Sequence, residues 1–227
     1  MSNSLIFMRL LFTIFSSLQL FAQPQTATKT WYDKINQTTY TFYDDQVVKE
    51  YFTYNKKDTI FFNPTPIDYP DYNSIWYEDA LHLTSNRGGL VYRVEKDTTI
   101  RIDRSFQHRK QSQASQFVYR DTLFRYGGYG FWRANNFFTY FDKTTKEWEY
   151  YPIEGFQFPP EAYGAPCFLL GDTFYSFGGT EVNKFTGLAG KKNNDIWTFN
   201  FTTRKWVNLG KTAVNLSPYK IVQKDSL

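Results

Sequence analysis

A short motif built around an aspartate occurs four times and constrains the fold more than any other feature of the sequence. In each copy, apolar residues lead into a polar turn that contains the aspartate, and a small residue then starts the next apolar run. Aspartate suits this place because it accepts hydrogen bonds from nearby backbone amides and tolerates turn geometry. The aspartates are 42, 51 and 53 residues apart: Asp79, Asp121, Asp172 and Asp225. A spacing near 50 residues indicates a chain made of repeated structural units.

A strand-like run and a pair of glycines follow the first three copies of the motif. Gly127-Gly128 comes after Thr122–Tyr126. Gly178-Gly179 comes after Thr173–Phe177. Gly88-Gly89 ends a less regular copy of the same arrangement. Paired glycines at a strand end supply positive φ angles, or a close backbone approach, that a Cβ atom would block. An aromatic run and one further strand come next, so each unit is expected to hold four short strands.

Composition favours strands throughout the chain. Aromatic residues make up 21% of it, with 23 Phe and 18 Tyr, and these residues are enriched in strands. The runs are short and are bounded by Gly, Asp, Asn and Lys, as short antiparallel strands require. We therefore expect an all-β protein. The formal charge of +4 is spread over 227 residues without a run of five basic residues, so no nucleic-acid partner is expected.

The ordered set of features resembles the kelch repeat: a strand ending in Gly-Gly, an aromatic strand, and a tryptophan a few residues later. The positions that carry the resemblance are Gly127, Gly128, Tyr140 and Trp148 in one unit and Gly178, Gly179, Trp197 and Trp206 in the next. The unit at Gly88-Gly89 is degenerate, because Ile100-Arg-Ile102 stands where its tryptophan is expected. The resemblance covers about residues 74–227, and the same superfamily includes the galactose oxidase central domain. It implies a kelch-type β-propeller of four-stranded antiparallel blades.

The N-terminal residues are typical of a targeting segment. Arg9 precedes an apolar stretch of 13 residues, Leu10–Ala22, which is too short to cross a bilayer and fits the core of a signal peptide. We expect residues 1–22 to be a signal peptide and the protein to be exported to the periplasm, the cell surface or the medium. Residues 23–73 are interpreted as hairpins or a divergent blade, and residues 74–227 as kelch-like blades. No transmembrane helix is expected.

The last residues suggest an incomplete repeat. Ile221–Leu227 contains the fourth copy of the aspartate motif and stops at the first residue of the strand that should follow. An unpaired hairpin edge would be exposed at such an end. The blades in this sequence are also too few for a closed ring of the usual size. We expect a truncated chain that forms a partial propeller, with its last blade cut and its ring incomplete.

Little in the sequence suggests catalysis. Cys167 is the only cysteine and lies in an apolar run, so it is expected to be a core thiol without a disulfide. His82 and His108 are not at metal-ligand spacing, and no cofactor or metal is expected. Galactose oxidase, which the family resemblance includes, needs copper ligands that this chain does not match. Sialic-acid mutarotases are kelch-like propellers that would need an acid or base, and nothing marks Glu154, Glu161 or Glu181 for that role.

Binding is the favoured function. The loop Tyr129–Asn136 carries the candidate binding residues Tyr129, Phe131, Trp132, Arg133 and Asn135. Aromatic rings beside Arg and Asn suit a protein contact or stacking on a sugar. The alternative is that Phe131 and Trp132 pack between blades. The polar segment Thr180–Asn194 is expected to be a mobile loop. The sequence thus predicts a non-catalytic module that binds a protein or another ligand, or alternatively a carbohydrate-binding or mutarotase-like propeller whose partner is a glycan.

Overall fold

The fold is built from antiparallel strands joined mostly by short turns. The computed structural model describes residues 29–33, 37–43, 46–61, 72–95, 98–105, 111–183 and 185–213, and these residues contain no helix. They form four sheets of four or five strands and one small two-stranded hairpin. The all-β prediction is therefore confirmed. The expected signal peptide at 1–22, His108 and the fourth aspartate, Asp225, lie outside the described residues.

The first two sheets are simple meanders in which each strand pairs with the next. The first contains β1 (Lys29–Asp33), β2 (Thr38–Phe42), β3 (Gln46–Tyr51) and β4 (Lys56–Phe61). The second contains β5 (Tyr72–Tyr77), β6 (Ala80–Ser85), β7 (Val91–Val94) and β8 (Thr99–Arg101).

The third and fourth sheets follow the same meander with additions. The third contains β9 (Ser115–Tyr119), β10 (Thr122–Tyr126), β13 (Phe138–Asp142) and β14 (Glu147–Tyr150), and the hairpin β11 (Tyr129–Gly130) and β12 (Arg133–Ala134) is inserted between β10 and β13. The fourth contains β16 (Cys167–Leu170), β17 (Thr173–Val182), β18 (Ala189–Asn200) and β19 (Lys205–Lys211), and β15 (Ala162–Tyr163) pairs with the far end of β17.

The aspartate motif forms a two-residue turn between the first two strands of the last three sheets. Tyr77 pairs with Ala80, Tyr119 with Thr122, and Leu170 with Thr173. Both turn residues have positive φ angles in the first two copies: Glu78 and Asp79, then Arg120 and Asp121. Such angles define the turn whose twist matches a two-residue hairpin.

The glycine pairs are used in two different ways. In the third and fourth sheets both glycines have positive φ angles, as at Gly127 (68°) and Gly128 (86°). A Cβ atom at Gly128 would also lie 2.8 Å from the carbonyl oxygen of Ser112. Gly88 and Gly89 have no positive φ angle, and Gly89 is needed for space because its missing Cβ would collide with Ser105. In the degenerate unit Gly89 is therefore required for packing and not for a positive φ angle.

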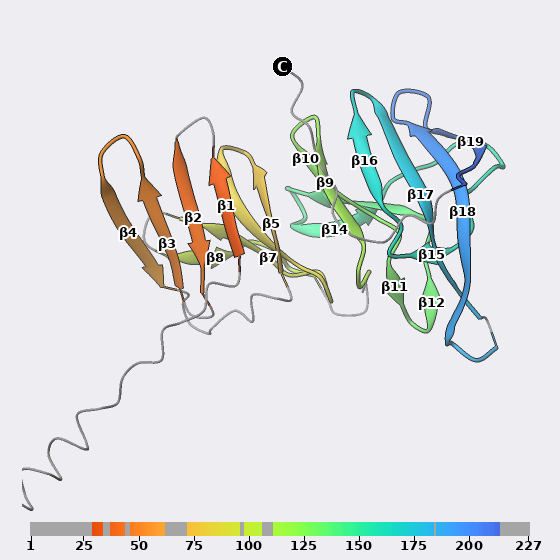
Figure 1. The fold of residues 1–227 in the computed structure, drawn as a ribbon, viewed down its shortest axis with the longest axis horizontal. Helices are drawn as coiled ribbons and strands as arrows, with labels where there is room; N and C mark the ends of the chain where they lie inside the picture. The colour runs from red at the N-terminus through yellow and green to blue at the C-terminus, as the bar shows by residue number, and fades with distance from the viewer. Residues whose placement is uncertain are drawn as a thin grey trace, which may run out of the picture.

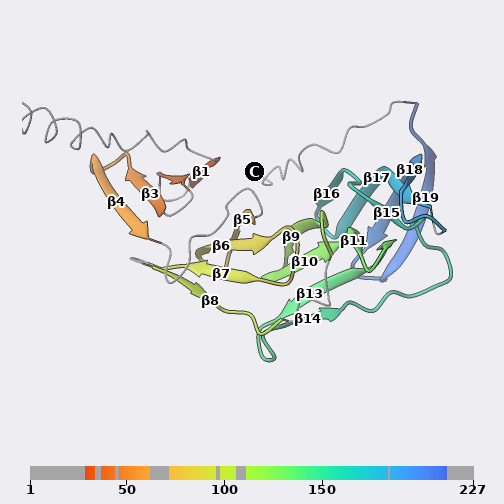
Figure 2. The same cartoon turned by 90° about the horizontal axis from the view of Figure 1, so that it is seen from below.

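The sheets are stacked face to face, and each successive pair encloses a hydrophobic core. Figures 1 and 2 both show the sheets following one another from the orange N-terminal strands to the blue C-terminal strands. The three cores have these buried members: Tyr40, Phe42, Val47, Ile60, Leu81, Leu83 and Val94 between the first and second sheets; Tyr77, Val91, Leu123, Phe141 and Trp148 between the second and third; Phe117, Phe124, Tyr126, Phe138, Cys167, Phe174, Phe199, Phe201 and Trp206 between the third and fourth.

Alternation along the second strand of each sheet divides its side chains between two neighbours. Leu81, Leu123 and Phe174 stand at the same place in the repeat, two residues after the aspartate, and each packs toward the preceding sheet. The next residue in each strand points to the opposite face because successive side chains of a strand alternate. Each middle sheet therefore contributes to two cores, as a blade within a stack must. The sheets that the structure describes do not close a ring.

One sequence expectation about a loop needs correction. Thr180–Asn194, expected to be a mobile loop, is mostly strand, because β17 continues to Val182 and β18 begins at Ala189. Register shifts within this hairpin allow the long strands to bend past the glycine pair. Within the described residues there is also no helix that is long and apolar enough to cross a membrane.

Candidate functional site

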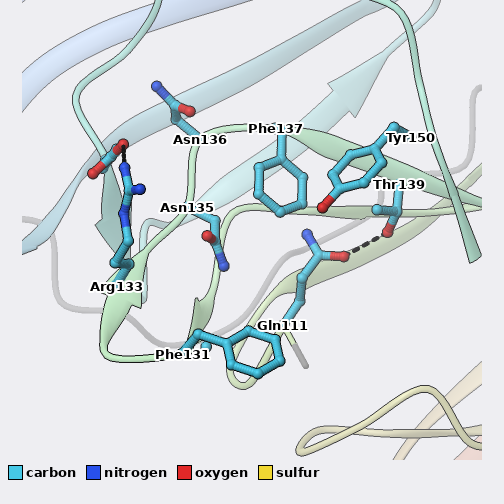
Figure 3. A pocket seen from close by; sticks show the side chains of 10 residues that line it. Gln111, Phe131, Arg133, Asn135, Asn136, Phe137, Thr139 and Tyr150 are labelled. Carbon is cyan, nitrogen blue, oxygen red and sulfur yellow. Dashed lines mark hydrogen bonds and ion pairs between the residues drawn. The ribbon is translucent and has the colours of Figure 1, made fainter. Parts of the chain in front are cut away.

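A pocket of about 260 Å³ lies at one end of the third sheet, where the inserted hairpin meets the connections to neighbouring sheets. Figure 3 shows the residues that line it: Gln111, Gly130, Phe131, Arg133, Asn135, Asn136, Phe137, Thr139, Tyr150 and Glu161. Gln111 precedes β9, Tyr150 ends β14, and Glu161 precedes β15. The pocket therefore draws on segments that are 50 residues apart in the sequence.

A buried amide forms the floor of the pocket. The Gln111 side chain donates from Nε2 to the carbonyl oxygen of Gly127 at 3.0 Å, and its Oε1 accepts a hydrogen bond from Oγ1 of Thr139 at 2.5 Å. Both side chains are buried. These two bonds hold the amide in one orientation, so the floor has fixed polarity.

Two aromatic rings form one wall. Phe137 and Tyr150 meet edge to face, with their ring centroids 4.9 Å apart. Figure 3 shows both rings beside Thr139, and Phe131 on the opposite side of Gln111. Tyr150 is largely exposed, so its ring is available to a ligand. Aromatic rings with a polar tip offer both an apolar face and a hydrogen-bonding group.

Charged and amide groups form the other wall. Nη2 of Arg133 lies 2.7 Å from Oε1 of Glu161, which links the inserted hairpin to the segment before β15. Asn136 donates from Nδ2 to the carbonyl oxygen of Pro159 at 2.7 Å and fastens the same two segments together. The side chain of Asn135 lies between Arg133 and Gln111 in Figure 3. The pocket thus presents amide, guanidinium and carboxylate groups opposite aromatic rings.

The turn of the inserted hairpin holds two exposed aromatic residues. Phe131 and Trp132 have φ angles of 52° and 65° and are 67% and 80% exposed. The expectation that they pack between blades is therefore wrong. Positive φ angles are unusual for bulky residues and cost on the order of 1–3 kcal/mol each where the surroundings hold them.

A second exposed turn lies beside the first. The turn between β17 and β18 carries Phe185 and Leu188, both largely exposed. A Cβ atom at Gly187 would lie 3.7 Å from the Trp132 ring, which places the two turns in contact. Figure 1 shows β11 and β12 next to the far end of β18. Aromatic and aliphatic side chains from two units therefore gather beside the mouth of the pocket.

The predicted binding residues fall into three groups. Phe131, Arg133 and Asn135 line the pocket, and Trp132 lies at the exposed turn outside it. Tyr129 is structural: its amide donates to the carbonyl oxygen of Ser112 at 2.7 Å and its ring packs near Tyr163.

Sequence reasoning missed several pocket residues. Gln111, Phe137, Thr139 and Tyr150 were not singled out, and Glu161 was considered without a reason to prefer it. They lie on four different segments, and no spacing in the sequence brings them together. A glutamine before the first strand of a blade carries no signal of its own.

The residues that carry the kelch resemblance serve packing. Trp148 is buried and donates from Nε1 to the carbonyl oxygen of Gly89 at 2.8 Å. Trp206 is buried in the core between the third and fourth sheets, and Trp197 and Tyr140 pack against that core while partly exposed. The pairs Gly127-Gly128 and Gly178-Gly179 supply positive φ angles, the first after β10 and the second within β17, where the strand pairing shifts register. None of these positions lines the pocket.

Two titratable groups, Cys167 and His82, are buried away from the pocket. Burial raises the pKa of Cys167 to about 12 and lowers the pKa of His82 to about 4, so both side chains are neutral at pH 7. His82 lies between the second and third sheets, with Nδ1 3.1 Å from the carbonyl oxygen of Ala80. Among the described residues no group of three or more His, Cys, Asp or Glu side chains could hold a metal ion.

Comparison with known proteins supports the fold. No protein-family model matches the chain, and no curated protein matches it at a significant level. Solved structures do match. One of them, the structure of YjhT, has a TM-score of 0.59 at 13% sequence identity and covers 86% of this chain and 68% of its own. At this identity the likeness concerns the fold alone. Together with the four-stranded antiparallel sheets, it identifies the stack as blades of a β-propeller-like fold.

Proposed function

We propose that the protein is a non-catalytic propeller module that binds a small polyhydroxylated ligand, such as a carbohydrate, in the pocket at the end of the third sheet. The observation that carries this proposal is the lining of the pocket. Aromatic rings of Phe137 and Tyr150 face a fixed amide at Gln111 and polar side chains of Asn135 and Arg133. Binding sites combine apolar surface with a few well-placed polar groups in this way.

The chemistry of the lining favours a sugar over an apolar ligand. A sugar ring has an apolar face of C–H groups that can stack on an aromatic ring, and hydroxyl groups that both donate and accept. Asn135 offers a donor and an acceptor, and the Arg133–Glu161 pair offers a donor fork and a carboxylate. The volume is slightly below the usual range for drug-sized ligands, which suits one or two sugar rings.

The pocket gives less support to catalysis. Its one carboxylate, Glu161, is held in an ion pair with Arg133, with Oε1 2.7 Å from Nη2. Surface ion pairs of this kind mainly fix orientation. We therefore assign Glu161 to ligand orientation.

A glycan array followed by calorimetry tests the proposal. We expect retention on a defined set of glycans, and Tyr150→Ala should weaken the affinity by at least tenfold because it removes the exposed half of the aromatic wall. Tyr54→Ala is the matched control, since Tyr54 is 77% exposed on the turn between β3 and β4, away from the pocket. Absence of glycan binding, or equal losses in the two variants, would remove the carbohydrate proposal.

A mutarotase-like enzyme is the second candidate, and the observation that favours it is the presence of Glu161 in the pocket. A carboxylate there could move a proton between ring and open forms of a sugar. The rate of anomer interconversion of a bound sugar, measured by NMR, separates the candidates. A rate above the buffer rate that Glu161→Gln abolishes would support the enzyme, whereas binding without acceleration supports the module.

Two further parts of the proposal concern family and location. We place the chain with kelch-type propellers because Trp148 and Trp206 occupy the same repeat position after Gly-Gly pairs with positive φ angles. We also propose export by a signal peptide at residues 1–22, a divergent blade within 23–73 and kelch-like blades from 74 onward. Fractionation of the native cells, with sequencing of the mature N-terminus, tests export. Full-length protein in the cytosolic fraction would contradict it.

A further inference from the structure

Two neighbouring turns present large apolar side chains to solvent. Phe131 and Trp132 lie on the turn between β11 and β12, and Phe185 and Leu188 lie on the turn between β17 and β18. Trp132 is 80% exposed and Phe185 is 98% exposed. The turns are in contact through Trp132 and Gly187, and Figure 1 shows them together at the lower end of the third and fourth sheets. These four exposed side chains form what we call the apolar tip.

The backbone holds the apolar tip in place. Oδ1 of Asn183 accepts hydrogen bonds from the amides of Phe185 and Thr186 at 2.9 and 3.2 Å, which fixes one turn. In the other turn Phe131 and Trp132 both have positive φ angles, which bulky residues rarely adopt because they are strained. A strained turn that keeps two rings in solvent gains nothing from a core, so the rings suit contact with another surface.

Two lysines stand directly behind the apolar tip. Lys191-Lys192 is exposed on β18, and no ion pair in the described part of the chain involves either side chain. Glu181, on the strand paired with β18, accepts a hydrogen bond from Asn193, and the nearby Arg133 and Glu161 neutralise each other. The region around the two turns therefore carries an excess of positive charge.

The spacing between the apolar and basic groups fits the interface of a bilayer. Lys191 follows Leu188 by three residues, which is about 10 Å along a strand at about 3.3 Å per residue. Amphipathic helices that lie on a bilayer bury their apolar side about 5–10 Å into the boundary between headgroups and acyl chains. With the apolar tip at that depth, Lys191-Lys192 would lie at the level of the lipid phosphates.

A second aromatic turn in the chain lacks the unpaired charge. The turn between β3 and β4 carries Phe52 and Tyr54, which are 63% and 77% exposed. The lysines that follow are each paired with a carboxylate: Lys56 with Asp58, and Lys57 with Glu50. Basic side chains contribute to membrane binding through attraction to anionic lipids, and a paired lysine contributes less. This turn is therefore a matched comparison for the apolar tip.

We propose that the two turns form a membrane-docking surface that inserts Trp132, Phe185 and Leu188 into the interface of an anionic phospholipid bilayer. Lys191-Lys192 contacts the lipid phosphates. A lipid surface fits better than a protein partner, because protein interfaces are depleted in lysine, whereas membrane-bound elements combine lysine with Trp, Phe and Leu. The inference does not depend on the ligand proposed for the pocket.

Flotation with vesicles tests the proposal on the full chain. The vesicles contain phosphatidylcholine alone, or phosphatidylcholine and phosphatidylglycerol at about two to one. We expect binding to the anionic vesicles to be at least tenfold tighter than to the neutral ones. The double variant Phe185→Ala/Leu188→Ala should weaken anionic binding at least tenfold, and Lys191→Gln/Lys192→Gln should remove most of the preference for anionic lipid. Phe52→Ala/Tyr54→Ala, the matched control, should change binding by less than about twofold.

Tryptophan fluorescence follows insertion without the alanine variants. Trp132 is largely exposed, whereas Trp148 and Trp206 are buried. Vesicles with brominated acyl chains should quench the fluorescence of the parent protein, and Trp132→Phe should lose that quenching. Quenching that persists in Trp132→Phe would overturn insertion at this turn, even if the alanine variants fail to fold.

The remaining outcomes also decide the matter. Absence of binding to anionic vesicles overturns the proposal, and so do equal losses in the tip and control variants. Binding that both tip variants retain would belong to another part of the chain, such as Leu10–Ala22, and counts against the proposal. Binding that is lost at about 1 M salt but does not respond to Phe185→Ala/Leu188→Ala would reflect general attraction of a positively charged chain, which also overturns it.

Discussion

The core between the third and fourth sheets and the core between the second and third are built from different chemistry. The former is aromatic: Phe138 stacks on Trp206 with centroids 5.5 Å apart, and Phe174 meets Phe138 edge to face. The latter contains a buried cation. The guanidinium of Arg125 lies 3.9 Å from the Trp148 ring centroid and donates to the carbonyl oxygens of Gly88 and Ser85.

The difference shows that a repeat position can change its chemistry when the opposite sheet changes with it. Arg125 stands at the position held by Leu83 in the second sheet and Ser176 in the fourth. Its charge is accepted because the Gly88-Gly89 segment, which lacks a turn with positive φ, directs backbone carbonyls into the interface. Burial still disfavours the cation and lowers the pKa of Arg125 to about 9.

Truncating an aromatic ring in the aromatic core should have the largest effect. Phe138→Ala removes a fully buried ring that contacts six other aromatic residues, and it should lower the free energy of unfolding by about 3–5 kcal/mol. Urea denaturation measures this change in the free energy of unfolding. Phe156→Ala is the matched control, since Phe156 is fully exposed and its loss should change stability by less than about 0.5 kcal/mol. Equal effects would refute the assigned core.

Removing the buried cation should be the next largest effect. Arg125→Ala leaves the carbonyl oxygens of Ser85 and Gly88 without their donor and should cost about 2–3 kcal/mol. Arg125→Met keeps most of the volume and removes the charge that burial disfavours, so it should cost less than the alanine variant. If methionine costs as much as alanine or more, filling the volume does not offset the loss of the guanidinium donors.

Acid should weaken the polar interface through His82. Its pKa is lowered to about 4 by burial, so between pH 6.5 and 4 the unfolded chain binds the proton more readily than the folded chain. Stability from this group is therefore complete above pH 6.5 and falls as the pH drops, by about 2 kcal/mol at pH 4.5.

The histidine can be isolated from other titrating groups. Arg93, Glu78 and Glu95 also act electrostatically on His82, and its ring packs edge to face with Tyr77. Urea denaturation of the parent protein and of His82→Phe, each at pH 7 and at pH 4.5, gives the loss of unfolding free energy in acid for each of the two proteins. The variant should show a smaller loss in acid, and an unchanged loss would assign the acid sensitivity to other groups.

The smallest expected effect is the difference in stability between variants of the two buried tryptophans, Trp148 and Trp206. Nε1 of Trp148 donates to Gly89, whereas Nε1 of Trp206 is buried without a hydrogen-bond partner among the described residues. Replacement by phenylalanine removes similar ring area in both cases. Trp148→Phe should therefore cost about 1 kcal/mol more than Trp206→Phe. The order of the two midpoints in urea checks this, and the reverse order would contradict the hydrogen-bond argument.

Features of the fold that depend on local repeats could be predicted from the sequence. The aspartate turns, the positive φ angles at Gly127-Gly128 and Gly178-Gly179, and the apolar setting of Cys167 follow from residue types at short spacing. The position of Gly178-Gly179 at a strand end does not, because β17 continues through the pair to Val182. Arg125 could not be recognised as a core residue, because its acceptors are backbone carbonyls that a sequence does not display.

The candidate site was only partly predictable for a related reason. The hairpin at Tyr129–Asn136 was identified as a binding loop from its composition, and three of its five candidates line the pocket. Gln111 and Glu161 reach the pocket only because the connections to neighbouring sheets converge at one end of the third sheet. The exposure of Phe131 and Trp132 depends on a turn geometry that aromatic residues seldom adopt.

The placement of the cores between sheets, and not within them, also sets the smallest piece of this protein that can stand alone. A single sheet has two faces and no interior of its own, so an isolated sheet would expose both faces to solvent. Two adjacent sheets share one complete core. Stability in such stacks is a sum over neighbouring pairs, and opening can begin at an end without disturbing the middle. The cooperative unit is accordingly the pair of sheets, and the repeat seen in the sequence is half of it.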